Sequence, residues 1–384
     1  MTTGRKTYLK EAALLFLRIG ATAFGGPAVC IAIMQRETVR KRAWLDDQRF
    51  LDILGVSNLI PGPTATEMAL YLGLERAGWL GYLATGLLFI IPGMIATIAI
   101  AWVYVKYASL PAVGWILYGV KPVIIVVIIQ ALWDLGKKGV KGPLTALVGA
   151  AAIVSYLFGF NAIAILFAGA AVVLLFQTGK RLWTGASSLF MFSPILPLWM
   201  SVSSIDKIPF KQSTLFLTFL KIGAVIYGGG YVLYAFLNSE FVIHLGWLTH
   251  QQLLDAITVG QITPGPLSTS ATFVGYLMGG WQSALLATLA IFLPAFILIA
   301  LVSRILPSLR KSWWSGALLD GVNVAALGLM AAVTWQLGRT GIIDWFTIVL
   351  AVMTLALILR LKVNSTWLIV GGAMLGVTYK FIVR

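Results

Sequence analysis

Long apolar runs dominate this sequence and restrict the folds open to it. A helix of roughly 20 residues crosses the hydrocarbon core of a bilayer. Runs of about that length lie near 12–34, 79–105, 113–133, 214–237, 281–303 and 317–336, and shorter pairs lie at 143–160 with 161–178 and at 345–360 with 365–381. No alternating barrel pattern is visible, and open strands cannot satisfy their backbone groups in lipid. The sequence therefore predicts an all-α integral membrane protein.

Composition excludes most soluble classes. The chain is 59% hydrophobic and 11% charged, whereas soluble domains are roughly 45–50% apolar and about 25% charged. Cys30 is the only cysteine, and the two histidines are His244 and His250, so a disulfide framework, a zinc cluster and a Cys/His catalytic pair are not expected. No nucleotide motif is visible either, so we expect neither an enzyme nor a bound metal or cofactor.

An internal repeat with an interval of 203 residues divides the chain in two. Phe16-Leu17-Arg18-Ile19-Gly20 aligns with Phe219-Leu220-Lys221-Ile222-Gly223, and Pro61-Gly62-Pro63 aligns with Pro264-Gly265-Pro266. After the deletion of one residue, Trp79 aligns with Trp281. The repeat predicts two homologous transmembrane halves, at 1–178 and 212–384, joined by a cytoplasmic linker at 179–211.

Positive charge is distributed reciprocally between the two halves. Segment 35–49 holds five Lys or Arg residues, and its counterpart 238–252 holds none. Basic clusters between apolar runs are typical of membrane orientation rather than of nucleic-acid binding, so no nucleic-acid partner is expected. The reciprocal pattern predicts inverted topology, which requires an odd number of crossings in each half. About five spans and one re-entrant hairpin per half, about ten spans in all, satisfy that count with both chain ends outside.

Proline and glycine interrupt the apolar pattern at matching places in both halves. Pro61-Gly62-Pro63 and Pro264-Gly265-Pro266 should each end one short helix and start another, at mid-membrane depth. A second break, at Gly25-Gly26-Pro27 and at Gly228-Gly229-Gly230, interrupts the first apolar run of each half. Helix starts expose unpaired N–H groups and the positive end of the helix dipole, which suits a small anion.

Hydroxyl and amide side chains cluster at the two Pro-Gly-Pro breaks. In the first half they are Asn58, Thr64 and Thr66, and in the second half they are Gln261, Thr263, Ser268, Thr269 and Ser270. The same residue types cap helices for purely structural reasons, so a structural role and a ligand role are equally open for each of them. With Gly25, Gly26, Gly62, Gly228, Gly229 and Gly265, they form the predicted substrate site.

Ionisable residues within apolar runs mark possible ion pathways. Arg18 and Lys221 are equivalent in the repeat and could complement an anion, although either could instead extend to a membrane interface. Lys121 lies inside the run 113–133 and is a candidate anion-binding or proton-linked group. Glu67 follows the first Pro-Gly-Pro and is a candidate proton carrier, or a first-turn acid that stabilises its own helix.

The repeated motifs resemble a known family. They are Phe24-Gly25-Gly26-Pro27 and Asn58-Leu59-Ile60-Pro61-Gly62-Pro63-Thr64 in the first half, and Gly246-Trp247-Leu248-Thr249, Thr263-Pro264-Gly265-Pro266 and Gly321-Val322-Asn323 in the second. The chain resembles the chromate ion transporter family in its long, two-domain form. This resemblance implies a multi-pass protein of a prokaryotic plasma membrane that exports chromate, uses the proton-motive force and confers chromate resistance. Two positions depart from the family pattern, because Ala28-Val29-Cys30 lacks a histidine and Glu67 replaces a glutamine.

The leading interpretation is a secondary transporter of a divalent tetrahedral oxyanion, with chromate, or another oxyanion such as sulfate, and protons as its small partners. An uncoupled anion channel with the same site is the alternative. The lipid bilayer is the expected surrounding medium. The sequence does not decide between a monomer and a homodimer.

Overall fold

The computed structural model describes residues 2–107, 111–184, 209–227, 230–302, 313–361, 363 and 365–383. Secondary structure in these ranges is helical, without a strand. Within the described ranges, six helices are long and apolar enough to cross a membrane: Thr64–Tyr107, Val113–Gly139, Ala162–Gly179, Leu267–Leu301, Gly316–Gly341 and Ser365–Ile382. Three shorter apolar helices are Pro143–Leu157, Gln212–Val225 and Trp345–Leu361. The expectation of an all-α membrane protein is confirmed.

The first predicted span, 12–34, is wrong because it is a hairpin. α1 (Thr2–Thr22) and α2 (Pro27–Gln35) are separated by Gly25 and Gly26, whose φ values are 110° and 83°. Glycine adopts such angles without a steric penalty, so the chain can reverse there. After η1 (Arg36–Lys41), a π-helix, the indole N–H of Trp44 donates to Glu11 Oε1 at 3.1 Å. After the hairpin, the chain has therefore returned to the part of α1 that holds Glu11.

The second half repeats this hairpin, so the predicted span 214–237 is wrong for the same reason. α8 (Gln212–Val225) is followed by a break, by α9 (Leu233–Leu237) and by the π-helix η2 (Asn238–His244). The rings of Phe210 and Trp247 then meet with centroids 5.2 Å apart. Gly230 has a φ of 85°, and Gly228 and Gly229 lie outside the described residues.

The breaks predicted at the two Pro-Gly-Pro motifs are present. α3 (Asp47–Ser57) ends before the first motif, and α4 (Thr64–Tyr107) begins after it. Arg49 and Glu75 form an ion pair, so this segment is also a hairpin. α4 reverses again at Gly78, whose φ is 67°. In the second half, α10 (His250–Ile262), η3 (Leu267–Thr269) and α11 (Ser270–Val302) follow the same path, with the later reversal at Gly280.

The last helices of each half pack on the other half. They are α5 (Pro111–Gly139), α6 (Pro143–Leu157) and α7 (Ala162–Thr184) in the first half, and α13 (Trp313–Gly341), α14 (Trp345–Leu361) and α15 (Ser365–Ile382) in the second. α6 and α7 pack against α13, and α14 and α15 pack against α5. α4 contacts α11 and α5 contacts α13, so the two halves interlock.

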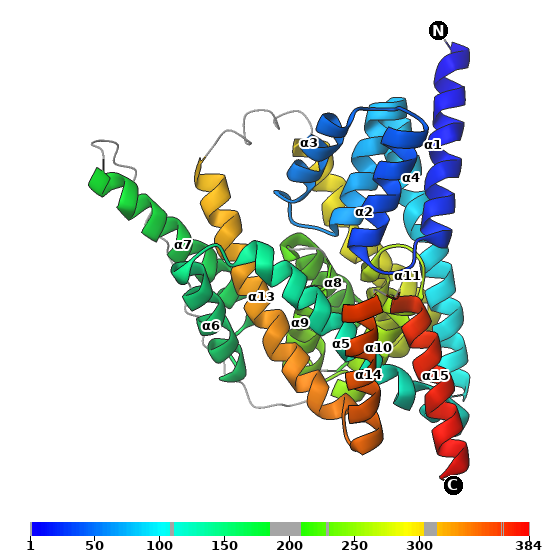
Figure 1. Cartoon of the computed structure of the whole chain (residues 1–384). Coiled ribbons are helices and arrows are strands. Elements are labelled where there is room, and N and C mark those ends of the chain that lie inside the picture. Colours follow the sequence, from blue (N-terminus) through cyan, green and yellow to red (C-terminus); the bar gives the residue numbers. More distant parts are fainter. Residues whose placement is uncertain are drawn as a thin grey trace.

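The chain ends differ from expectation. α1 begins and α15 ends at opposite ends of the molecule (Figure 1), whereas five crossings in each inverted half predict both chain ends on one side. Each half has two hairpins rather than one, because its glycine break reverses the chain instead of kinking a span. The linker predicted at 179–211 lies mostly outside the described residues.

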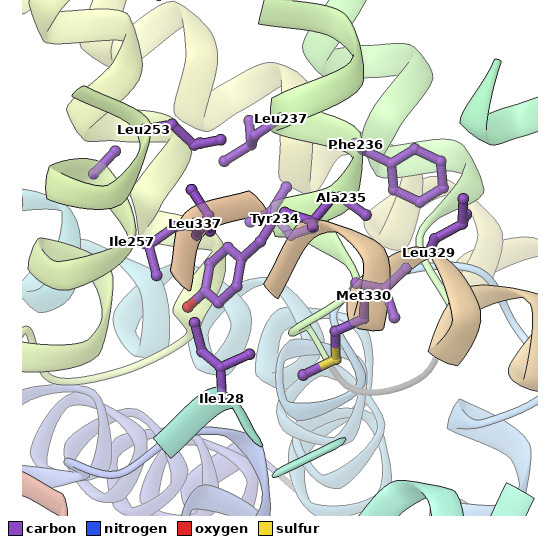
Figure 2. Packing of buried hydrophobic residues seen from close by; sticks show 14 of the residues in the cluster. Ile128, Tyr234, Ala235, Phe236, Leu237, Leu253, Ile257, Leu329, Met330 and Leu337 are labelled. Carbon is purple, nitrogen blue, oxygen red and sulfur yellow. The ribbon is translucent and has the colours of Figure 1, made fainter. Parts of the chain in front are cut away.

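A buried apolar core lies where the halves interlock. Figure 2 shows Tyr234 among side chains that belong to α5, α9, α10 and α13. The labelled neighbours are Ala235, Phe236 and Leu237 of α9, Leu253 and Ile257 of α10, Leu329, Met330 and Leu337 of α13, and Ile128 of α5. Because α5 belongs to the first half and the other three helices to the second, this core fixes the position of α9 and α10 against both halves.

Close helix contacts at glycine give a first prediction. A Cβ added at Gly20 would collide with the carbonyl oxygen of Phe89, and a Cβ at the equivalent Gly223 would collide with that of Ile291. We expect Gly20→Ala to lower the free energy of unfolding by about 1–3 kcal/mol, as overpacking does. A Cβ at Gly136 meets nothing within 4 Å, so Gly136→Ala should be neutral or slightly stabilising. Thermal unfolding of the purified variants in detergent measures both, and equal stability of the two would contradict the packing.

Candidate functional site

The Pro-Gly-Pro tip of each half is hydrogen-bonded to the glycine break of the other half. Gly62 N–H donates to the Ile226 carbonyl oxygen at 2.8 Å, and Gly265 N–H donates to the Ala23 carbonyl oxygen at 3.0 Å. The two bonds are equivalent under the repeat. They satisfy non-helical backbone within an apolar bundle, which tolerates such backbone only where protein or a cavity accommodates it. The tips and breaks of both halves therefore meet in one region, here called the tip region (23–27, 61–67, 226–231 and 264–270).

Two helix starts in the tip region carry unpaired donors. Thr66 N–H donates to Pro63 O at 2.8 Å, and Thr269 N–H donates to Pro266 O at 3.1 Å. The N–H groups before them, of Thr64 and Ala65, have no hydrogen-bond partner among the described residues. The corresponding N–H groups of Leu267 and Ser268 likewise have none in the described part of the chain. Such groups at a helix N-terminus favour an anion.

The predicted polar side chains of the second half are all buried: Gln261 and Thr263 just before the tip region, and Ser268, Thr269 and Ser270 within it. Three of them have structural partners, because Gln261 Nε2 donates to the Tyr234 hydroxyl at 3.3 Å, Thr269 Oγ1 to Pro266 O at 3.0 Å and Ser270 Oγ to Leu267 O at 2.9 Å. Ser268 Oγ is buried and has no partner among the described residues. Of this set, Ser268 has donor capacity left for a ligand.

The first half contributes Thr64, Thr66 and Glu67, all buried. Thr66 Oγ1 has no hydrogen-bond partner in the described ranges, and neither has either carboxyl oxygen of Glu67. Asn58, in contrast, is exposed. A Cβ on Gly62 would collide with Glu67 Oε1, so the Glu67 carboxyl group lies directly against the tip. Only glycine at position 62 leaves room for this contact.

The first glycine break contacts the second half closely. A Cβ on Gly26 would lie 2.6 Å from the hydroxyl oxygen of Tyr231. Cys30 Sγ lies 3.7 Å from the carbonyl oxygen of Gly265, near enough for a weak hydrogen bond. Gly25 shares the break, and Gly228 and Gly229 remain predictions because they lie outside the described residues.

Lys121 forms a buried ion pair that sequence reasoning did not find. Its Nζ lies 2.7 Å from Asp255 Oδ1, and the two side chains are 5% and 3% exposed. The Tyr104 hydroxyl donates to Asp255 Oδ2 at 2.9 Å. The pair joins α5 of the first half to α10 of the second. Lys121 is thus neutralised by a carboxylate, and its predicted contact with an anion would require that pair to open.

Arg18 and Lys221 lie on outer helix faces. Arg18 is exposed beside Leu14 and Leu17 on α1. The side chain of Lys221 is 46% exposed, and its Nζ lies 2.8 Å from Glu240 Oε2. The structure does not bring either cation to the tips, so their role at the anion site stays a prediction.

The hairpins of the first half open at an ionic cluster, here called the first mouth (Glu11, Glu37, Lys41, Arg42, Trp44, Arg49, Glu75 and Arg76). Glu37 lies in η1, where hydrogen bonds from Lys41 and Arg42 hold its pKa down to about 2. Arg76 pairs with Glu11 at 2.6 Å. The corresponding second mouth keeps one ion pair, between Lys221 and Glu240, and is otherwise aromatic, with Phe210 against Trp247 and Phe219 against Phe241. The two mouths therefore differ in charge although the backbones match.

Comparison with known proteins adds the family. The chromate transporter family model matches residues 10–174 and again 213–377, so both repeats are recognised. This chain belongs to the chromate transporter family. It is 31% identical over 370 residues to a chromate transport protein of Cupriavidus metallidurans, covering 96% of this chain and 92% of that protein.

Two further relatives of this family member are similar over most of their length. A probable chromate transport protein of Synechococcus elongatus is 30% identical over 377 residues, which is 97% of this chain and 95% of the relative. An uncharacterized transporter of Methanocaldococcus jannaschii is 26% identical, covering 92% and 90%. All three relatives bear the name of a transporter or a transport protein. A comparison with solved structures gives no match.

Removing one partner of the Lys121–Asp255 pair tests its burial. We expect Lys121→Met to lower the free energy of unfolding by about 3–5 kcal/mol, because Asp255 is left as an uncompensated buried charge. The double variant Lys121→Met with Asp255→Leu should recover most of that loss. Lys141 pairs with Asp320 on the surface, with its side chain 61% exposed, so Lys141→Gln should cost about 0–1 kcal/mol. Unfolding curves that rank the two lysine variants equally would contradict the buried pair.

Proposed function

We propose that this protein is a secondary transporter that exports chromate across the plasma membrane of a prokaryote and uses the proton-motive force. Membership of the family and the names of its relatives support chromate as the cargo. The observation that carries the mechanism is the paired helix starts at the tips, which offer unpaired N–H groups from both halves in one region. A tetrahedral dianion of the sulfate shape matches several such donors at once.

Glu67 is the proposed proton-coupling group. Its carboxyl group lies against Gly62 at the start of α4, where an anion would bind. An ionised Glu67 would occupy and repel that position, and a protonated Glu67 would not. Its two carboxyl oxygens are buried without partners in the described residues, and burial without compensation favours the neutral form. Protonation and anion binding are therefore expected to favour each other.

The direction of proton movement follows from the competition between the anion and the ionised Glu67 carboxylate for one position. If a proton accompanies the dianion, one net negative charge moves outward in each cycle. A membrane potential contributes about 2.3 kcal/mol per elementary charge per 100 mV, so the inside-negative potential drives export. The electrical component of the proton-motive force, rather than the pH difference, would then supply the energy. Chromate and the proton thus move in the same direction, whereas an anion–proton exchanger moves them in opposite directions.

We further propose that the two repeats, 1–178 and 212–384, are inverted relative to each other, with a crossing count other than the expected five per half because the chain ends lie at opposite ends of the molecule, and that they rock against each other about the tip region. The equivalent helices α5 and α13 run in opposite vertical directions in Figure 1. The tip-to-break hydrogen bonds are exchanged reciprocally between the halves. Parting of the tips would open the site to one mouth while the other stays closed.

Chromate flux in proteoliposomes under an imposed potassium diffusion potential tests the proposal. An inside-negative potential should accelerate efflux, and acid on the side from which chromate leaves should accelerate it further. Glu67→Gln should remove the response to pH while leaving the response to potential, since Gln keeps the shape of the side chain without its proton equilibrium. Thr354→Val serves as a matched control away from the tips, because its buried hydroxyl bonds to the Leu350 carbonyl oxygen within α14, and it should keep both responses.

Three outcomes would overturn the proposal. Flux in the Glu67→Gln variant that keeps the wild-type pH response would remove Glu67 as the coupling group. Flux indifferent to protons and far faster than transporter turnover would favour an uncoupled anion channel. Transport of sulfate without chromate would reassign the cargo.

A further inference from the structure

We propose that Tyr71 and Glu75 form the path by which protons reach Glu67 from the first mouth. This proposal rests on the proposed role of Glu67 as the coupling group. The three residues lie four apart on the first leg of α4, which is helical from Thr64 to the reversal at Gly78. Residues spaced by four share one face of a helix, each about 6 Å further along the axis. They form a line of proton-carrying groups from the mouth to the tip.

Exposure rises steadily along this line. Glu67 is 0% exposed, Tyr71 is 4% exposed, and the Glu75 side chain is 38% exposed where it pairs with Arg49 at the first mouth. Tyr71 lies within electrostatic reach of Glu67, Glu75 and Arg49. The line therefore joins a group in contact with water to a group that has no access to water of its own.

Packing does not explain why the residue at position 71 carries a hydroxyl group. It is buried and has no hydrogen-bond partner among the described residues, and an unpaired buried hydroxyl costs stability. Phenylalanine would fill the same space without that cost. A hydroxyl can accept one proton while it donates another. A role in proton relay would therefore explain why position 71 carries a hydroxyl that lowers stability.

Other titratable groups near Glu67 do not offer such a route. Tyr82 and Tyr227 are within its electrostatic reach. The Tyr82 hydroxyl donates to the Phe296 carbonyl oxygen, so its proton is engaged. Tyr227 belongs to the glycine break of the second half and lies at the tips, not between Glu67 and a mouth.

The second half lacks the line of groups. Glu67 corresponds to Ser270 in the repeat, and the positions one and two turns later hold Phe273, Val274, Leu277 and Met278. The positions equivalent to Tyr71 and Glu75 on that leg of α11 therefore hold no side chain that can pass a proton, and the hydroxyl groups of Thr272 and Tyr276 lie at other positions of the helix. Protons therefore enter from the first mouth only, which makes the two repeats unequal in function although their backbones correspond.

The transfer leaves no charge on the tyrosine. A proton from water or from the Glu75 carboxyl group binds the Tyr71 hydroxyl oxygen as the proton of that hydroxyl moves to the Glu67 carboxylate. Bridging water carries the proton across the remaining distance in each step. The net change is one proton gained by Glu67 and one lost at the mouth.

Tyr71→Phe and Glu75→Gln test the path in proteoliposomes. We measure the initial rate of chromate-dependent proton movement with a pH-sensitive dye, in H2O and in D2O, beside the chromate flux. Both variants should fold as the wild type does, lower the proton-coupled rate at neutral pH at least tenfold and recover part of it at low pH. Tyr276→Phe, on the matching leg of the second half, and Arg49→Gln, which breaks the same ion pair as Glu75→Gln, should keep the wild-type rate.

The controls separate the possible failures. If Glu67→Gln keeps the pH response, the proposed coupling group is wrong. If Glu67→Gln loses the response while Tyr71→Phe and Glu75→Gln keep the wild-type rate and isotope effect, Glu67 stands and the path is wrong. If Arg49→Gln slows transport as much as Glu75→Gln does, Glu75 acts through its ion pair and not through its proton.

Discussion

The hydrogen bonds between each Pro-Gly-Pro tip and the opposite glycine break are the constraint on which the rest of the structure depends. Backbone that leaves the helix inside an apolar bundle needs partners that lipid cannot provide. Gly62 and Gly265 find them in Ile226 and Ala23, so neither half can satisfy its own break. The Pro-Gly-Pro breaks create the helix starts, and the meeting of the two halves brings those starts together at the anion site proposed for this family member.

The two halves share a backbone plan and differ in charge. At the tip, Glu67 of the first half corresponds to Ser270, whose hydroxyl donates to the Leu267 carbonyl oxygen. At the mouths, an ionic cluster corresponds to an aromatic one. Lys121 of the first half pairs with Asp255, whereas the equivalent position to Lys121 is the neutral Asn323. These differences make the two ends of a repeated backbone chemically unequal.

Sequence reasoning found the helical membrane fold, the repeat, the Pro-Gly-Pro breaks and the family, because periodicity, proline chemistry and repeated motifs are local signals. It took 12–34 and 214–237 for spans, because apolar length does not reveal whether glycine kinks or reverses a helix. The Lys121–Asp255 pair was missed because its partners are far apart in sequence and only tertiary packing joins them. Arg18 illustrates the same limit, since sequence position cannot tell an outer face from an inner one.

The most direct measurement locates the anion itself. Anomalous X-ray scattering from chromium, in crystals of the protein grown with chromate, marks the bound ion without assumptions about its ligands. The account predicts a peak in the tip region, within hydrogen-bond distance of N–H groups from both the Thr64 and the Leu267 helix starts. A peak at the basic residues of the first mouth, or on the outer face beside Arg18, with none at the tips, would contradict it.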